Sequence, residues 1–157
     1  MLVLARFIQL RKPAMQIGVE TANAVDQRRV FVVDEDEITR AALQFMLHDE
    51  IETHELGSLE EAFDKGQGWM LPDVILLGVS IVGARGEGVI GEIVARYPNI
   101  RILIVTGKED EAIAIGALKA GAHGALVKPL TLEAVRKKID TILGRAGGAT
   151  LVQLGGL

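Results

Sequence analysis

The stretch of sequence that decides the fold is PDVILLG, which occupies residues 72–78. Pro72 ends the preceding segment, and the apolar run that follows is typical of a buried strand. Similar runs lie at residues 30–34, 100–106 and 126–127. Between them, apolar residues recur at helical spacing, so the pattern predicts strands that alternate with helices in a parallel sheet.

Local signals place the remaining elements. Residues 51–56 alternate in polarity, which predicts a second strand at an edge of the sheet. Ser58 and Glu61 form a capping box, Thr131 can cap the last helix, and the glycines of residues 80–88 predict a loop. The helical stripes are Ile38, Ala41, Ala42 and Phe45 in the first helix, Ile90, Ile93, Val94 and Tyr97 in the third, and Leu132, Val135, Ile139 and Ile142 in the last.

Composition and charge limit the classes of function. A chain of 157 residues with 49% apolar residues can form one domain with one sizeable core. The net charge of -4 argues against direct nucleic-acid binding. The lack of cysteine excludes disulfides and fits a cytoplasmic location, and His48, His54 and His123 lack the spacing of a metal site. No run approaches the ~20 apolar residues of a membrane span.

The first ten residues are apolar but contain Arg6 without a basic segment before it, so a signal peptide is not expected. They could form an amphipathic helix for a partner, precede a true start at Met15, or be an appendage. The expected division of the chain is an N-terminal extension at residues 1–28, one α/β domain at 29–144 and a C-terminal tail at 145–157.

Five strand–helix units of this size predict an α/β fold with a doubly wound parallel sheet. Such sheets bind ligands beyond the carboxyl ends of their strands, so the residues at those ends should surround one crevice. They are Asp34, Glu35, Gly78, Thr106 and Lys128. Each of them could also be an ordinary strand-terminal or surface residue.

The order of these residues resembles the receiver domain of bacterial two-component response regulators. The resemblance implies a flavodoxin-like receiver fold with five strands in the order 2-1-3-4-5. It implies that Asp34 and Glu35 form the acidic pair that binds Mg²⁺, and that Thr106 and Lys128 contact the phosphoryl group. Gly78 then stands at the position of the phospho-accepting Asp, which would make the chain a degenerate pseudo-receiver.

The missing acceptor predicts a module that is not an enzyme. Gly78 offers neither a nucleophile nor a metal ligand, so we expect no catalytic residue and no cofactor. Mg²⁺ binding by Asp34 and Glu35 should be weak or vestigial. Ala125 also replaces the Tyr or Phe that the family commonly has. Without an acceptor beside it, Lys128 should lie against Asp34 or Glu35.

The expected function is that of a stand-alone receiver-like module of two-component or phosphorelay signal transduction, acting by phosphorylation-independent protein–protein interaction. The expected partner is a protein, either a histidine kinase or another regulator, and not a nucleic acid or a membrane. The resemblance also suggests a homodimer through the fourth helix, fifth strand and fifth helix. There, acidic residues 109–111 could face basic residues 136–138 of a second copy.

Two alternatives remain at the crevice. A phosphoryl group could be accepted by a non-standard acidic residue, namely Asp34, Glu35 or Asp36. Alternatively, the space left by Gly78 could bind a small anion.

Overall fold

The structure is a computed structural model that describes residues 26–145. Its five strands form a parallel sheet in the order β2-β1-β3-β4-β5, as predicted. The strands are β1 Asp26–Val33, β2 Ile51–Leu56, β3 Val74–Gly78, β4 Arg101–Thr106 and β5 Gly124–Val127. The helices are α3 Glu37–Leu47, α4 Leu59–Lys65, α5 Val79–Arg85, α6 Gly88–Arg96, α7 Glu111–Lys119 and α8 Leu132–Leu143, with 3₁₀ turns η2 Gly68–Met70 and η3 Lys108–Asp110.

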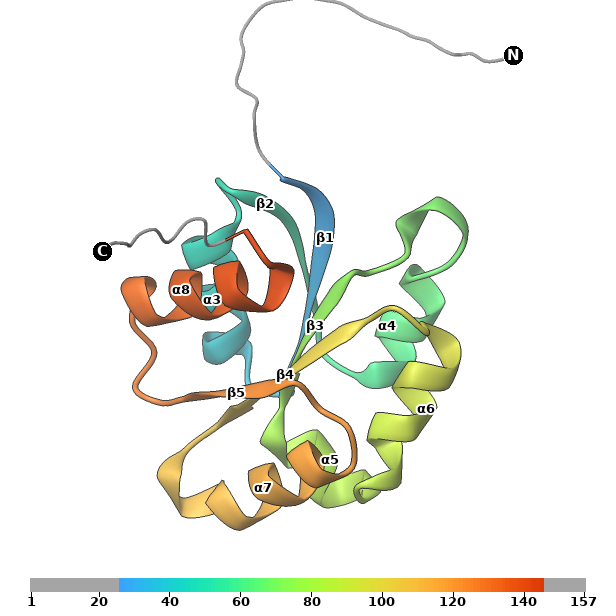
Figure 1. Ribbon diagram of the computed structural model, residues 1–157, viewed down its shortest axis with the longest axis vertical. Coiled ribbons are helices and arrows are strands. Elements are labelled where there is room, and N and C mark those ends of the chain that lie inside the picture. The colour runs from blue at the N-terminus through green and yellow to red at the C-terminus, as the bar shows by residue number, and fades with distance from the viewer. Residues whose placement is uncertain (1–25, 146–157) are drawn as a thin grey trace, which may run out of the picture.

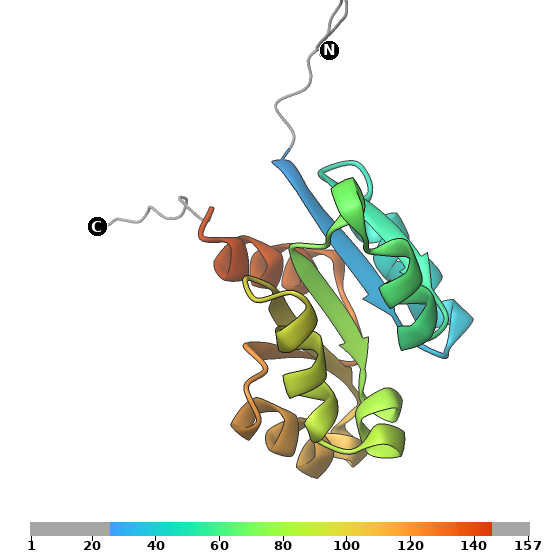
Figure 2. The ribbon, with the colours of Figure 1, turned by 90° about the vertical axis from the view of Figure 1, so that its right-hand side faces the viewer.

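Helices cover both faces of the sheet (Figures 1 and 2). Helices α3 and α8 pack on one face, while α4, α5, α6 and α7 pack on the other, and each layer encloses its own cluster of buried side chains. The central strands β1, β3 and β4 are therefore buried on both sides, which explains their apolar runs without alternation. None of the helices within residues 26–145 has the length and apolar character needed to cross a bilayer.

The predicted extension and tail fall mostly in residues 1–25 and 146–157, which lie outside the described residues. The last three residues of the expected extension, 26–28, belong to β1. The strand therefore begins four residues before the apolar run that predicted it.

Side-chain caps fix where two helices begin. The Ser58 hydroxyl accepts the amide hydrogen of Glu61 at 3.1 Å, and the Glu61 carboxylate accepts the amide hydrogen of Gly57 at 3.0 Å. At α8, the Thr131 hydroxyl accepts the amide hydrogen of Ala134 at 3.2 Å. The Ser58 and Thr131 caps are confirmed, because each hydroxyl satisfies one amide that the first helical turn leaves free, whereas Glu61 bonds the amide of Gly57 just before the N-cap.

The apolar stripe that the sequence suggested for the first helix does not face the core. Ile38 and Phe45 are 80% and 76% exposed, whereas Thr39, Leu43 and Leu47 are buried against the sheet. Leu43 and Leu47 pack in the same buried cluster as residues of β1 and β3, and the cap residue Asp36 accepts both the Ile38 amide hydrogen and the Thr39 hydroxyl hydrogen. Helix α3 thus presents a second apolar stripe to the outside.

The predicted loop at residues 80–88 is largely helical. Helix α5 runs from Val79 to Arg85 and ends at Gly86, whose φ of 87° is left-handed. Gly83 lies against Ile113 of α7. The glycine that suggested a loop is therefore part of α5, at its contact with α7.

Candidate functional site

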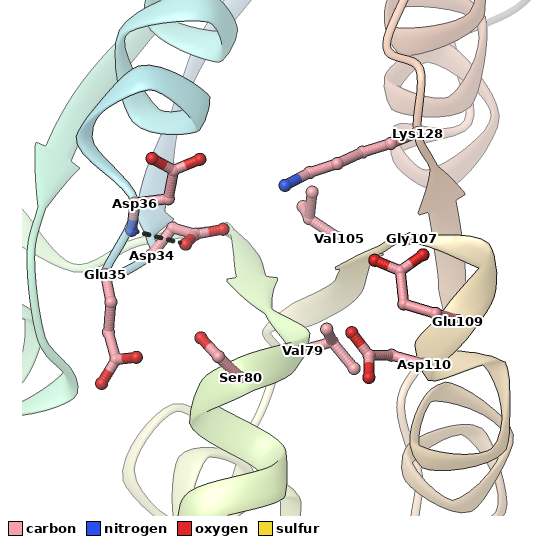
Figure 3. A pocket seen from close by; sticks show the side chains of 10 residues that line it. All are labelled: Asp34, Glu35, Asp36, Val79, Ser80, Val105, Gly107, Glu109, Asp110 and Lys128. Atoms are coloured by element: carbon pink, nitrogen blue, oxygen red, sulfur yellow. Dashed lines mark hydrogen bonds between the residues drawn. The ribbon is translucent and has the colours of Figure 1, made fainter.

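A pocket of ≈ 390 Å³ lies at the carboxyl edge of the sheet (Figure 3). It is lined by Asp34, Glu35, Asp36, Val79, Ser80, Val105, Gly107, Glu109, Asp110 and Lys128. Side chains that follow β1, β3, β4 and β5 therefore meet at one place, as parallel strands require. Of the predicted site residues, Asp34, Glu35 and Lys128 line this pocket.

Asp34 is the most enclosed acid of the pocket, with 5% of its surface exposed. Its carboxylate accepts the amide hydrogen of Asp36 at 2.9 Å, and its carbonyl oxygen accepts a hydrogen from Arg40 at 2.8 Å. Burial raises the pKa of this carboxyl, and the Asp36 amide and the charge of Lys128 only partly oppose that rise. The ionised form of Asp34 therefore lowers the free energy of unfolding.

Gly78 ends β3 directly beside this carboxylate. A Cβ built on Gly78 would lie 2.5 Å from Oδ2 and 2.6 Å from Cγ of Asp34. Real side chains do not approach so closely, so the Asp34 carboxylate fills the space that any side chain at position 78 would enter. Glycine at this position is what allows Asp34 to keep its present orientation.

The two acids that follow Asp34 point in different directions (Figure 3). Asp36 caps α3, and the Thr39 hydroxyl that donates to its carboxylate lowers its pKa. Glu35 is exposed and turns away from Asp36. Among residues 26–145, no three acidic or imidazole side chains lie close enough together to hold a metal ion. Asp34 and Glu35 therefore have no third acidic or imidazole side chain of the described residues beside them that could complete a set of three protein ligands.

Thr106 and Lys128 occupy different environments. Thr106 is buried at the end of β4, and its hydroxyl donates to the carbonyl oxygen of Gly107 at 2.8 Å instead of lining the pocket. Lys128 extends from the end of β5 toward the acids. The charge of Lys128 lowers the pKa of both Asp34 and Asp36.

The expected contact of Lys128 with Asp34 or Glu35 is not found. The ion pairs of the described part of the chain include none with Lys128. Its interaction with the acids is a longer-range attraction across the pocket.

The sequence analysis did not place Glu109 and Asp110 in this pocket. They belong to η3, which follows β4, and line the wall opposite Asp34 (Figure 3). Their position just after a strand of the parallel sheet was a signal that could have placed them at its carboxyl edge. The lining residues thus carry five carboxylates and one ammonium group, a balance that repels anions.

With this fold and pocket, the chain can be compared with known proteins. Residues 30–140 match the response regulator receiver domain family, and the chain belongs to that family.

The chain is 32% identical over 115 residues to a cyclic di-GMP phosphodiesterase of Thermotoga maritima, covering 73% of this chain and 30% of that protein. It is 31% identical over 122 residues to the DNA-binding transcriptional activator DevR/DosR of Mycobacterium tuberculosis, covering 75% and 56%. The match thus spans about half or less of the length of these relatives.

Two solved structures share the fold. The receiver domain of NtrX from Brucella abortus superposes with a TM-score of 0.66 at 22% identity, covering 73% of this chain and 98% of that chain. A response regulator from Thermotoga maritima gives a TM-score of 0.65 at 24% identity, covering 75% and 98%.

The opposite pKa shifts of Asp34 and Asp36 give a paired prediction. Because the pKa of Asp34 is higher in the folded state, its ionised form disfavours folding at neutral pH. Asp34→Asn should therefore raise the melting temperature at pH 7 by a few degrees, the scale of about 1 kcal/mol or less in a small domain. This gain should shrink as the pH falls toward 3.8, the ordinary carboxyl pKa.

Asp36→Asn is the matched control. The pKa of Asp36 is lowered in the folded state, so its charge favours folding above pH 3.8 and that contribution is lost as the pH falls below it. Removing the charge should lower the melting temperature at pH 7. Melting curves at pH 7 and pH 4 measure both effects, and a fall in melting temperature with both variants at pH 7 would contradict the assignment of burial as the cause at Asp34.

Proposed function

We propose that this receiver domain acts in two-component signalling without accepting a phosphoryl group, and that it works by binding a protein partner. The observation that carries the proposal is the contact between Gly78 and Asp34. On the receiver resemblance, position 78 is the one that carries the phospho-accepting Asp. Here that position has no side chain, and the space in front of it is filled by the carboxylate of Asp34.

The chemistry of the pocket supports a role that is not enzymatic. A receiver needs a metal ion to screen the attacking carboxylate from the incoming phosphoryl oxygens. The side chains of Asp34 and Glu35 do not converge with a third ligand in the described residues. The excess of carboxylates over Lys128 also disfavours the small-anion alternative. We therefore assign the pocket no catalytic residue and at most weak Mg²⁺ binding.

The partner would bind at exposed apolar side chains around the β5 edge of the sheet. The α7–β5–α8 surface comprises Ile115, Leu118, Val127 and Leu132, which are all exposed. Leu132 was expected to face the core, but it lies at the first position of α8, before the buried Val135 and Ile139. Clustered apolar exposure of this kind is characteristic of surfaces that bind proteins.

Some of the charges first expected to join two copies, at residues 109–111 and 136–138, lie in other environments. Arg136 forms ion pairs with Asp49 and Glu50, and Glu109 and Asp110 line the pocket. We expect a homodimer through the α7–β5–α8 surface to depend mainly on the exposed apolar side chains. A histidine kinase or another regulator remains the alternative occupant of this surface.

A second candidate function rests on the same contact. The Asp34 carboxylate occupies the space of the missing side chain, so it could itself attack the phosphorus of a small phosphodonor, displace the leaving group and form an acyl phosphate. The burial of this carboxylate, which limits the approach of a phosphodonor, argues against this route.

Intact mass after incubation with a small phosphodonor and Mg²⁺ distinguishes the two functions. The parent chain should keep its mass under conditions that label a receiver domain with an acceptor Asp treated in parallel. Gain of a phosphoryl group would contradict the proposal. If that label is absent from Asp34→Asn but present in Asp36→Asn, Asp34 is the acceptor.

Sedimentation at micromolar concentration tests the dimer. The parent should sediment as a dimer, and Ile115→Asp should sediment as a monomer, because a buried charge would oppose the apolar contact. Ile38→Asp is the matched control, since Ile38 is also exposed on a helix but lies outside the α7–β5–α8 surface. A monomeric parent, or dissociation by both variants alike, would contradict self-association through this surface.

A further inference from the structure

An apolar platform lies at the amino edge of the sheet, at the end opposite the pocket. It consists of Trp69 and Leu71, which are 82% and 51% exposed. Trp69 is the single tryptophan of the chain. Large aromatic side chains are seldom left so open, and an indole next to a leucine forms a surface suited to apolar side chains.

The Trp69–Leu71 platform is held in place by β1. The Arg29 guanidinium donates to the carbonyl oxygens of Trp69 and Leu71 at 2.9 and 3.1 Å. The same group lies 5.8 Å from the centre of the indole ring and forms an ion pair with Glu52 of β2. These contacts fix the backbone that carries both apolar side chains, so a binding segment would meet a preformed surface.

A cavity of ≈ 170 Å³ adjoins the platform. Leu71 lines it together with Tyr97, Pro98 and Ile100, and Pro72, Asp73, Arg96 and Asn99 complete its wall. An enclosed cavity of about 150 Å³ can hold a benzene molecule, and the present one is of similar volume but opens to solvent. This cavity could therefore accept one apolar or aromatic side chain from a segment lying on the platform.

The chain itself provides a segment of the right chemistry. Eight of residues 1–10 are apolar, namely Met1, Leu2, Val3, Leu4, Ala5, Phe7, Ile8 and Leu10. The described structure begins at Asp26, three residues before Arg29 contacts the platform. The fifteen residues 11–25 can span up to about 50 Å when extended, which is ample for the segment to return to this edge.

Tethering favours this segment over an external partner. A segment joined to its site by a short chain has an effective concentration of the order of millimolar, whatever the concentration of the protein. We propose that residues 1–10 pack on the Trp69–Leu71 platform, with the Phe7 ring in the adjoining cavity. This intramolecular contact covers the amino edge and leaves the α7–β5–α8 surface free.

Because Trp69 is the single indole, its fluorescence reports on the platform directly. In the full chain, its emission should be that of a covered indole and acrylamide should quench it weakly. Leu4→Asp/Phe7→Asp should shift the emission to longer wavelength and raise the quenching constant roughly twofold or more, because the indole would then face water. Gln9→Asp is the matched control, which adds a charge to the same segment without removing an apolar side chain.

The dependence on protein concentration separates the tethered segment from a second copy. The covered signal should be unchanged over a hundredfold dilution, since tethered binding is intramolecular. Loss of that signal on dilution would assign the platform to a second copy and overturn the proposal. An indole that is fully quenchable in the parent, or equally protected in Leu4→Asp/Phe7→Asp, would also overturn it. The variant changes lie outside the described fold, and far-ultraviolet circular dichroism checks that the domain stays folded.

Discussion

Two residues share a single space at the carboxyl edge of the sheet, and the character of the site depends on that constraint. The Asp34 carboxylate lies where a side chain at position 78 would extend, so it is compatible only with glycine there. In this place it is nearly enclosed and keeps its bond to the Asp36 amide. The same enclosure raises the pKa of the Asp34 carboxyl, because burial removes it from water.

The architecture could be predicted from the sequence because each central strand is long enough and apolar enough to require cover on both faces. The runs around Val33 and Leu76 indicated parallel strands, and the resemblance supplied their order. Ser58 and Thr131 were recognisable as caps because a cap depends on one side chain and the amide three residues later. Receiver membership, shown by the match over residues 30–140, followed from the same landmarks.

What could not be predicted depended on contacts between elements. Helical periodicity indicated a stripe of Ile38, Ala41, Ala42 and Phe45 for α3, whereas packing on the sheet buries Leu43 and Leu47. The glycines of residues 80–88 suggested a loop, yet this segment forms α5 and packs on α7 through Ile113. The orientation of Lys128 depends on how far the acids lie from it across the pocket. That distance cannot be read from the separation of these residues in the sequence. Glu109 was expected on an outer face of the domain. It lines the pocket instead because the turn η3, which the sequence did not indicate, sets the direction of its side chain.

The most direct test of the proposal that position 78 lacks a phospho-acceptor is to supply one and measure the response to Mg²⁺. Melting curves of the parent, Gly78→Asp and Gly78→Asn, with and without millimolar Mg²⁺, separate charge from steric effects, because both variants must displace the Asp34 carboxylate. Gly78→Asp should be the least stable of the three without metal and should gain the most with it. An ion at ten times its Kd adds about 1.4 kcal/mol of stability to a protein that binds it only when folded. The parent and Gly78→Asn should respond little. An equal response of all three proteins would contradict the account, because position 78 would then not belong to the metal and acceptor site.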